Sequence, residues 1–347
     1  MEAQKFDVAF NHVFTFCNIG IIHRTKIPSW IWLLSTAMAE HVANAVGIPV
    51  PASYCSPLFM DAGDNLSFVE RIKSFIGNTI ATPIAKRLTA DFETEIVRRH
   101  FGDDFPDLFE LSRECPLVNS NELYDFARPT LSKVINIGGI GIKIGEPKPL
   151  PEEYQTRVSL TNGFILMTFG SFAPMHRMPD SWKESFTSAF TQFPNIQFFI
   201  RYEESHDEWA KKIPKNDALH AGVPVLTIPL FSDQPKNAHL AEKLGMGIYV
   251  RKYQVAEKDT LLSSIIRLVE DDRLHMKARQ YRSILAKRPV SPEHLLVKWT
   301  ELAAEFHSLD SLTPFAIHLN PLVYHSLDVL GLLRILYSQL APKQKNE

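Results

Sequence analysis

Short apolar runs alternate along this chain with longer segments in which apolar residues recur at helical spacing. Six of the apolar runs have the length and composition of buried strands: residues 6–10, 29–34, 116–120, 163–170, 195–202 and 223–230. The helical spacing occupies residues 68–100, 179–193, 235–244, 257–271, 274–287 and 292–307. Strands that alternate with helices are typical of α/β proteins, so the pattern predicts an α/β fold with parallel sheets.

The last helical segment has a continuous apolar stripe, formed by Leu295, Leu296, Trp299, Leu302, Ala303 and Phe306. We interpret this stripe as core or interdomain packing rather than as a cofactor-binding surface.

Glycines and prolines concentrate between residues 138 and 151, and this composition predicts an interdomain linker. The glycines there do not fit G-x-G-x-x-G, and prolines follow where a dinucleotide-binding motif requires a helix. A length of 347 residues also favours two domains.

Composition narrows the function classes. Hydrophobic residues make up 45% and charged residues 22%, and the formal net charge is −2, so bulk electrostatics indicate no nucleic-acid or membrane-surface partner. Cys17, Cys55 and Cys115 are an odd number at wide spacing, which excludes a disulfide framework and predicts buried free thiols. The histidines have no metal-ligand spacing, so no metal site is expected.

The most informative chemistry follows the apolar run 223–230, where Asp233 and Gln234 precede a predicted helix. In open α/β sheets, ligands bind beyond the carboxyl ends of strands. A carboxylate beside a carboxamide offers acceptors and donors together, which suits the vicinal hydroxyls of a sugar. The alternative is that Asp233 only caps the helix, and on physical grounds alone this alternative is favoured.

A second candidate is Ser171, which follows Gly170 at the end of the run 163–170. Backbone N–H groups and a hydroxyl at such a strand end suit an anion such as a diphosphate. An ordinary turn explains the same residues equally well.

The run AGVPVLTIPLFSDQPKNAHLAEKLGMG closely resembles the second half of the signature of UDP-glycosyltransferases of the UDP-glucuronosyltransferase type. The resemblance extends to TFGS, VNSNELYDFARPTL, VINIGGIG and YHSLDVLGLL, and it therefore covers nearly the whole chain. The segments FDVAF and CPLVNSNELYD look most like nematode members.

The resemblance implies a GT-B fold of two Rossmann-like domains, with the acceptor in the first and the UDP-sugar in the second. It implies that Asp233 and Gln234 bind the sugar hydroxyls, that Ser171 lies near the diphosphate, and that Asp217 replaces the glutamate that binds the ribose. No cofactor is implied, since the UDP-sugar, UDP-glucuronic acid or UDP-glucose, is a co-substrate.

The chain also departs from the family pattern. The family's catalytic histidine lies in a segment that precedes FDVAF, and at the place of the aspartate that pairs with it stands His12. His12 has the pKa range of a base, but a histidine at a strand end is more often structural. Between Asn216 and Asp217 the family carries about 30 more residues, one βαβ unit, which include the W-x-P-Q and His-Gly-Gly motifs. Their loss is expected to leave a gap in the sheet or to force its strands to re-pair.

These features predict an incomplete acceptor domain (1–137), a linker (138–151), a UDP-sugar domain with an internal deletion at 216/217 (152–312) and a remnant of the anchor region (313–347).

The leading hypothesis is hexosyl transfer from a UDP-sugar to a small lipophilic hydroxyl compound. The alternative is a catalytically inactive, truncated chain that binds full-length family members in a homo- or hetero-oligomer, or that has no function. The resemblance implies the endoplasmic reticulum membrane, although the start is no signal peptide and the apolar stretch 322–341 is interrupted by charges.

Overall fold

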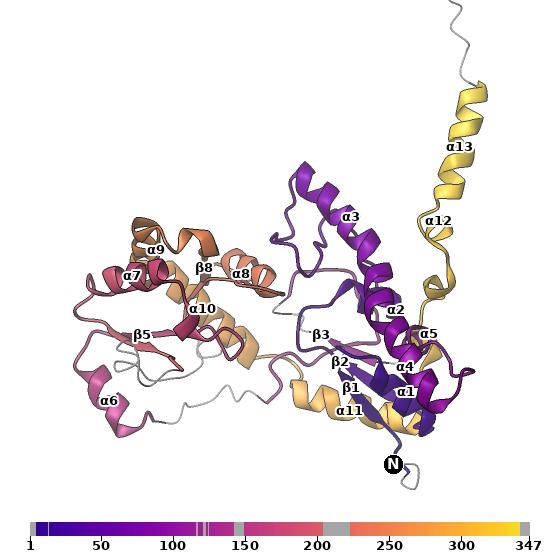
Figure 1. Ribbon diagram of the computed structural model, residues 1–347, viewed down its shortest axis with the longest axis horizontal. Helices are drawn as coiled ribbons and strands as arrows, with labels where there is room; N and C mark the ends of the chain where they lie inside the picture. Colours follow the sequence, from indigo (N-terminus) through magenta and orange to yellow (C-terminus); the bar gives the residue numbers. More distant parts are fainter. Residues whose placement is uncertain are drawn as a thin grey trace, which may run out of the picture.

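The computed structural model describes residues 5–12, 14–115, 117–120, 123, 125–141, 149–203 and 223–340. Two lobes lie side by side in Figure 1. We call the part that holds the first sheet the first lobe and the part between α6 and α10 the second lobe.

The first lobe is built on four parallel strands that pair in chain order: β1 (Ala9–His12), β2 (Trp30–Leu33), β3 (Leu117–Ser120) and β4 (Val134–Asn136). The predicted parallel α/β class is confirmed. Pairing of β1 with β2 begins only at Ala9, so the strand predicted over 6–10 is observed three residues later. The predicted linker begins after β4, and half of it (142–148) lies outside the described residues.

Five α-helices precede β3: α1 (Cys17–Arg24), α2 (Glu40–Val46), α3 (Phe68–Ala85), α4 (Phe92–Phe101) and α5 (Leu108–Arg113). The helix predicted over 68–100 is observed as three consecutive segments, since a π-helical turn, η1 (Lys86–Asp91), separates α3 from α4. Pro83 lies in the last turn of α3, where it lacks the N–H that a regular α-helix requires. Residues of α1, α2, α4 and α5 pack with β2 around Trp32, which is fully buried.

The second lobe contains two separate pairs of parallel strands. The first pair is β5 (Phe164–Met167) with β6 (Gln197–Ile200), and the second is β7 (Val225–Thr227) with β8 (Gly247–Tyr249). Within the described residues no ladder joins the two pairs. This agrees with the expectation of a gap in the sheet at the 216/217 junction, although residues 204–222 themselves are outside the described part.

Five α-helices belong to this lobe: α6 (Glu152–Ser159), α7 (Asp180–Phe190), α8 (Gln234–Lys243), α9 (Lys258–Glu270) and α10 (Asp272–Ala286). Short 3-10 turns lie at η2 (Met175–Arg177) and η5 (Lys252–Gln254). Both strand pairs pack on one core, which includes Phe186, Ile200, Ile248 and Leu261. Gly245 has a φ of +71° just after α8, as expected of a left-handed helix terminus.

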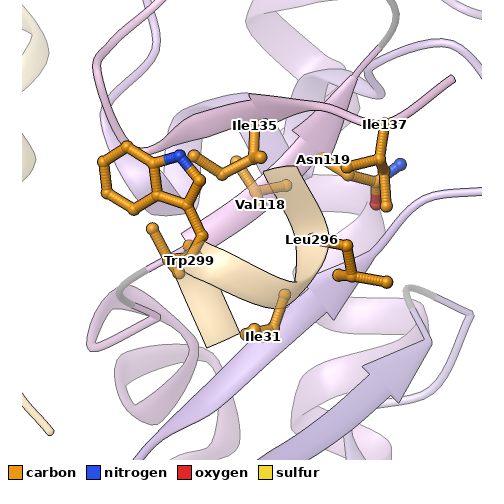
Figure 2. A pocket seen from close by; sticks show the side chains of 8 residues that line it. Ile31, Val118, Asn119, Ile135, Ile137, Leu296 and Trp299 are labelled. Carbon is orange, nitrogen blue, oxygen red and sulfur yellow. The ribbon is translucent and has the colours of Figure 1, made fainter. Parts of the chain in front are cut away.

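The chain then returns to the first lobe. α11 (Pro292–Phe306) lies against the first sheet, where Leu296 and Trp299 face Ile31 and Ile135 across a small apolar pocket (Figure 2). This packing agrees with the interpretation of the 292–307 stripe as core or interdomain packing, except that Phe306 at its end is exposed. Short elements follow at η6 (Asp310–Leu312), η7 (Phe315–His318) and α12 (Pro321–Tyr324), and α13 (Leu327–Leu340) extends away from the body (Figure 1).

Two further expectations can be compared with the fold. Cys55 and Cys115 are buried free thiols as predicted, and burial raises the pKa of Cys115 to about 12, whereas Cys17 is only partly buried. None of the described helices is both long and apolar enough to cross a membrane.

Candidate functional site

The start of α8 holds the two residues to which the sequence assigns sugar binding. β7 ends at Thr227, and the chain passes through a short loop in which Ser232 has a φ of +60°, a conformation that non-glycine residues seldom adopt. Asp233 then occupies the N-cap position and Gln234 the first helical position. Both side chains are half-buried, at the carboxyl end of a parallel strand.

The Gln234 side chain is fixed by the loop that precedes it. Its Oε1 accepts hydrogen bonds from the backbone N–H groups of Leu230 (2.8 Å) and Phe231 (3.4 Å). These bonds orient the amide, whose NH₂ group keeps two donors that have no partner among the described residues. Gln234 therefore offers pre-positioned donors at this strand end.

The Asp233 side chain does not cap the helix. No backbone N–H of α8 donates to it, and its Oδ2 instead accepts from Asn237 Nδ2 at 3.2 Å. The capping role that physical grounds favoured is therefore not the one observed. A carboxylate has about four acceptor sites, so most of its capacity is left for hydroxyl donors.

Ser171 lies in an exposed turn after β5, and its Oγ accepts from both Nη1 and Nη2 of Arg201, each at 3.4 Å. Arg201 directly follows β6, so the parallel pairing of β5 and β6 brings the two residues to the same sheet end. The Gly170 N–H already donates to Thr168 Oγ1 at 3.2 Å. The anion-binding capacity of this turn therefore comes from the Arg201 guanidinium, which suits phosphate, more than from the backbone.

Sequence reasoning missed Arg201. The available signal was a cation placed immediately after an apolar strand, at the end where ligands bind in α/β folds.

The structure brings only some of the predicted residues together. Asp233 and Gln234 are adjacent, and Ser171 follows a strand that packs on the same core as β7. Within the described residues no hydrogen bond links Ser171 to either of them, and Asp217 lies outside the described part. No described cluster of three or more His, Cys, Asp or Glu side chains is arranged to bind a metal ion.

His12 lies in the other lobe, at the end of β1. Its Nε2 is 3.1 Å from Ser35 Oγ, and its ring packs against Phe14 with centroids 4.5 Å apart. Both contacts are what a structural histidine at a strand end would make.

One further polar cluster joins the lobes, between the loop before α3 and the α8–β8 unit. Asp61 Oδ1 is 2.9 Å from His239 Nε2, and the Tyr249 hydroxyl lies 2.9 Å from both carboxylate oxygens of Asp61. Burial, and then the Asp61 hydrogen bond and charge, raises the pKa of Tyr249 to about 12. Lys243 pairs with Asp64 beside this cluster. These partners are 178 to 188 residues apart in the sequence, so no local pattern could have predicted them.

The chain was compared with known families and structures. The family model described as "UDP-glucoronosyl and UDP-glucosyl transferase" matches residues 1–216 and 216–341, so its match divides at the predicted deletion. The putative UDP-glucuronosyltransferase ugt-48 of Caenorhabditis elegans is 24% identical over 366 positions, which cover 95% of this chain and 69% of that protein. UDP-glucuronosyltransferase 3A2 of Homo sapiens is 27% identical over 365 positions, covering 93% and 66%.

The first of these alignments also indicates how many positions of the relative this chain lacks. It spans 366 positions, whereas 95% of 347 residues is about 330, so about 36 positions of the relative have no residue here. This total of about 36 positions is close to the block of about 30 residues that is predicted to be absent between Asn216 and Asp217.

Solved structures show the fold. Spinosyn forosaminyltransferase SpnP has a TM-score of 0.54 at 13% identity, covering 86% of this chain and 76% of that one. Spinosyn rhamnosyltransferase SpnG complexed with thymidine diphosphate has a TM-score of 0.52 at 13% identity, covering 85% and 73%. Such neighbours have the GT-B fold, which confirms the predicted architecture of two Rossmann-like halves.

Proposed function

Because this chain belongs to the UDP-glucuronosyl and UDP-glucosyl transferase family, we propose that it transfers a hexosyl group from UDP-glucuronic acid or UDP-glucose to the hydroxyl of a small lipophilic acceptor. In this reaction the acceptor oxygen forms a bond to the sugar C1 while the bond from C1 to the diphosphate oxygen breaks. The electron pair leaves with UDP, and the hydroxyl proton is released.

The start of α8 is the observation that carries this proposal. Gln234 is held by two backbone hydrogen bonds, its NH₂ group has no partner among the described residues, and Asp233 is not used as a helix cap. A donor pair beside a carboxylate matches neighbouring sugar hydroxyls, each of which both donates and accepts. Arg201, held against Ser171, supplies positive charge for the diphosphate, and we assign the ribose to Asp217. We assign His12 a structural role and no part in proton transfer.

A specific observation favours a second candidate, a catalytically inactive chain that binds other members of the family. The described strands of the second lobe form two unjoined pairs, and the family match divides at residue 216. Strand edges left without neighbours are surfaces to which another chain can add.

The domain division at the linker 138–151 and residence at the endoplasmic reticulum membrane remain part of the proposal.

Thermal unfolding with UDP and with UDP-glucose separates the two candidates, because a ligand that binds only the native state raises the midpoint as its concentration exceeds Kd. We expect both ligands to raise the midpoint. Because of the contacts of the sugar, UDP-glucose should shift the midpoint further than UDP does. Gln234→Ala should abolish this difference and leave the UDP shift intact, since Gln234 is assigned to the sugar. Gln155→Ala, an exposed glutamine on α6, is the matched control.

The remaining outcomes are equally informative. A cooperative transition that neither ligand moves would exclude donor binding and leave the non-catalytic candidate. If Gln234→Ala reduced the UDP and UDP-glucose shifts equally, the assignment of Gln234 to the sugar would be wrong.

A further inference from the structure

The proposed transfer needs a group that accepts the proton of the acceptor hydroxyl, and His12 makes only the contacts of a structural residue. A histidine paired with a carboxylate lies instead where the two lobes meet. His239 Nε2, on α8 of the second lobe, is 2.9 Å from Asp61 Oδ1, in the loop before α3 of the first lobe. A histidine that a carboxylate orients is the arrangement that many enzymes use for a general base.

The contact with Asp61 determines which ring nitrogen of His239 can accept a proton. An ionised carboxylate only accepts hydrogen bonds, so Nε2 of the neutral ring carries the proton and donates it to Oδ1. Nδ1 is then left with its lone pair. Within the described residues Nδ1 has no hydrogen-bond partner, and it is not a buried atom. The His239 side chain is 20% exposed, so a ligand has access to the ring.

Tyr249 completes the cluster from the end of β8. Its hydroxyl lies 2.9 Å from both carboxylate oxygens of Asp61. Burial, and then the hydrogen bond with Asp61, raises the pKa of Tyr249 to about 12, so the hydroxyl keeps its proton at neutral pH and donates to the carboxylate. The Tyr249 ring also meets the His239 ring edge to face, with centroids 4.8 Å apart. Asp61 and Tyr249 therefore hold the imidazole in one orientation.

The same cluster lies close to the candidate sugar site. His239 follows Gln234 by five residues on α8, which is a rise of about 7.5 Å along the helix axis. Tyr249 is paired in register with Thr227, the last residue of β7. The loop that leads from Thr227 to Gln234 and the Tyr249 side chain therefore share the carboxyl end of this strand pair, where ligands bind in α/β sheets.

We propose that His239 is the general base of the glycosyl transfer and that Asp61 and Tyr249 are its positioning residues. This inference rests on the proposed transferase function. His239 Nδ1 takes the proton of the acceptor hydroxyl while the acceptor oxygen forms its bond to the sugar C1. The bond from C1 to the diphosphate oxygen breaks, and its electron pair leaves with UDP. Asp61 stabilises the imidazolium, which then releases the proton to water.

The two halves of this base come from different lobes. Asp61 belongs to the lobe to which the acceptor is assigned, and His239 belongs to the lobe to which the UDP-sugar is assigned. The imidazole is therefore oriented for proton transfer only while the lobes are in contact, which is also the arrangement that brings acceptor and donor together.

Steady-state kinetics with two acceptors of different acidity test the proposal. The probes are phenol and para-nitrophenol, each with UDP-glucose and with UDP-glucuronic acid. Para-nitrophenol is partly ionised at neutral pH, so its transfer depends less on a base. We expect His239→Gln to lower kcat roughly 100-fold with phenol and much less with para-nitrophenol, with KM for the donor unchanged. A side chain that only supported the fold would affect both acceptors equally.

The positioning residues have their own expected effects. Asp61→Asn should lower kcat with phenol at least roughly 10-fold, because an amide no longer selects the Nε2–H tautomer or stabilises the imidazolium. Tyr249→Phe keeps the ring contact and removes one donor to Asp61, so it should have a smaller effect. His294→Gln, at an exposed histidine on α11, is the matched control and should leave kcat unchanged.

Nitrogen NMR of the imidazole rings in the whole chain gives a readout that does not depend on turnover. Neutral His239 should carry its proton on Nε2, and Asp61→Asn should reduce this preference. A proton found on Nδ1 in the wild type would overturn the proposal.

The kinetic outcomes separate this inference from the proposed function. If the wild type transfers sugar and His239→Gln retains full activity, or loses it equally with both acceptors, His239 is not the base and the transferase function still holds. If the wild type binds UDP and transfers sugar to neither acceptor, the transferase function itself fails and the base fails with it.

Discussion

Both lobes contain parallel sheets, but the described strands form one four-stranded sheet in the first lobe and two separate pairs in the second. In the first lobe, β2 and β3 each have a neighbour on both sides, and three of the four β2 residues are buried. In the second lobe all four described strands lie at the edge of a pair, and no residue of β5 or β7 is fully buried. Parallel strands are normally covered on both faces and flanked on both sides. Within the described residues, β5 and β7 each have only one neighbouring strand, and their incomplete burial agrees with this.

The largest expected effect comes from truncating the core beneath the four-stranded sheet of the first lobe. Trp32 is fully buried between β2 and the helices of the first lobe, so Trp32→Ala should destabilise that lobe by about 3–5 kcal/mol. Differential scanning calorimetry should show one of two transitions moving to lower temperature while the transition that UDP shifts stays in place. Trp32→Phe retains a ring and removes a buried N–H that has no partner within the described part of the chain, so it should have a much smaller effect.

Equal movement of both transitions would contradict the comparison. It would show that α11, which connects the second lobe to the first sheet, makes the chain one cooperative unit.

How far the sequence predicts this fold depends on the length of each apolar pattern. Long periodic segments such as 257–271 and 274–287 were predicted within about two residues of α9 and α10. β4 was not predicted, because three residues before a glycine-rich turn are too short to show a period. The break between α3 and α4 was missed because the π-helical turn, with its i→i+5 hydrogen bonds, is only six residues long, which is too short for its different period to show in the sequence.

The candidate site divides in a similar way. Asp233 and Gln234 were found because strand, loop and helix start are contiguous in the sequence. The hydrogen bonds from Leu230 and Phe231 that orient Gln234 come from the same loop as Ser232, whose positive φ no sequence pattern encodes. The contacts of Asp61 with His239 and Tyr249 arise only when the lobes meet, so they belong to tertiary structure alone.

A smaller effect is expected at Lys133, which is buried just before β4 in the four-stranded sheet of the first lobe. Its Nζ donates to Thr313 Oγ1 at 3.1 Å, and burial lowers the pKa of the ammonium from its ordinary value of 10.5. We expect Lys133→Met to stabilise the first lobe by about 1–3 kcal/mol at neutral pH, since it removes a charge with incomplete hydrogen bonding from the interior.

The same residue gives a pH dependence with a definite sign. Between the lowered folded pKa and 10.5 the unfolded chain binds more protons than the native protein, so the wild type gains stability as pH rises through this window. Denaturant unfolding of both proteins should show their difference shrinking as pH approaches about 10. A difference that stays constant with pH would mean that Lys133 has the same pKa in the folded and the unfolded protein.

The smallest effect is expected at the contact between the lobes. Asp61→Asn removes the charge that faces His239 and Tyr249, and because the carboxylate is about half exposed, we expect a loss of less than about 1 kcal/mol. The informative readout is hydrogen exchange, which resolves local opening that a global melt does not. Amide exchange should become faster in residues 58–66 and in β8, while β5 and β6, which make no contact with Asp61, keep their protection. Asp64→Asn is the matched control, since it breaks the neighbouring pair with Lys243 and leaves the Tyr249 contact in place. Faster exchange in β5 and β6 as well would show that the two strand pairs are coupled through their shared core, although no described ladder joins them. The two lobes would then differ in the hydrogen bonding of their sheets and not in their stability.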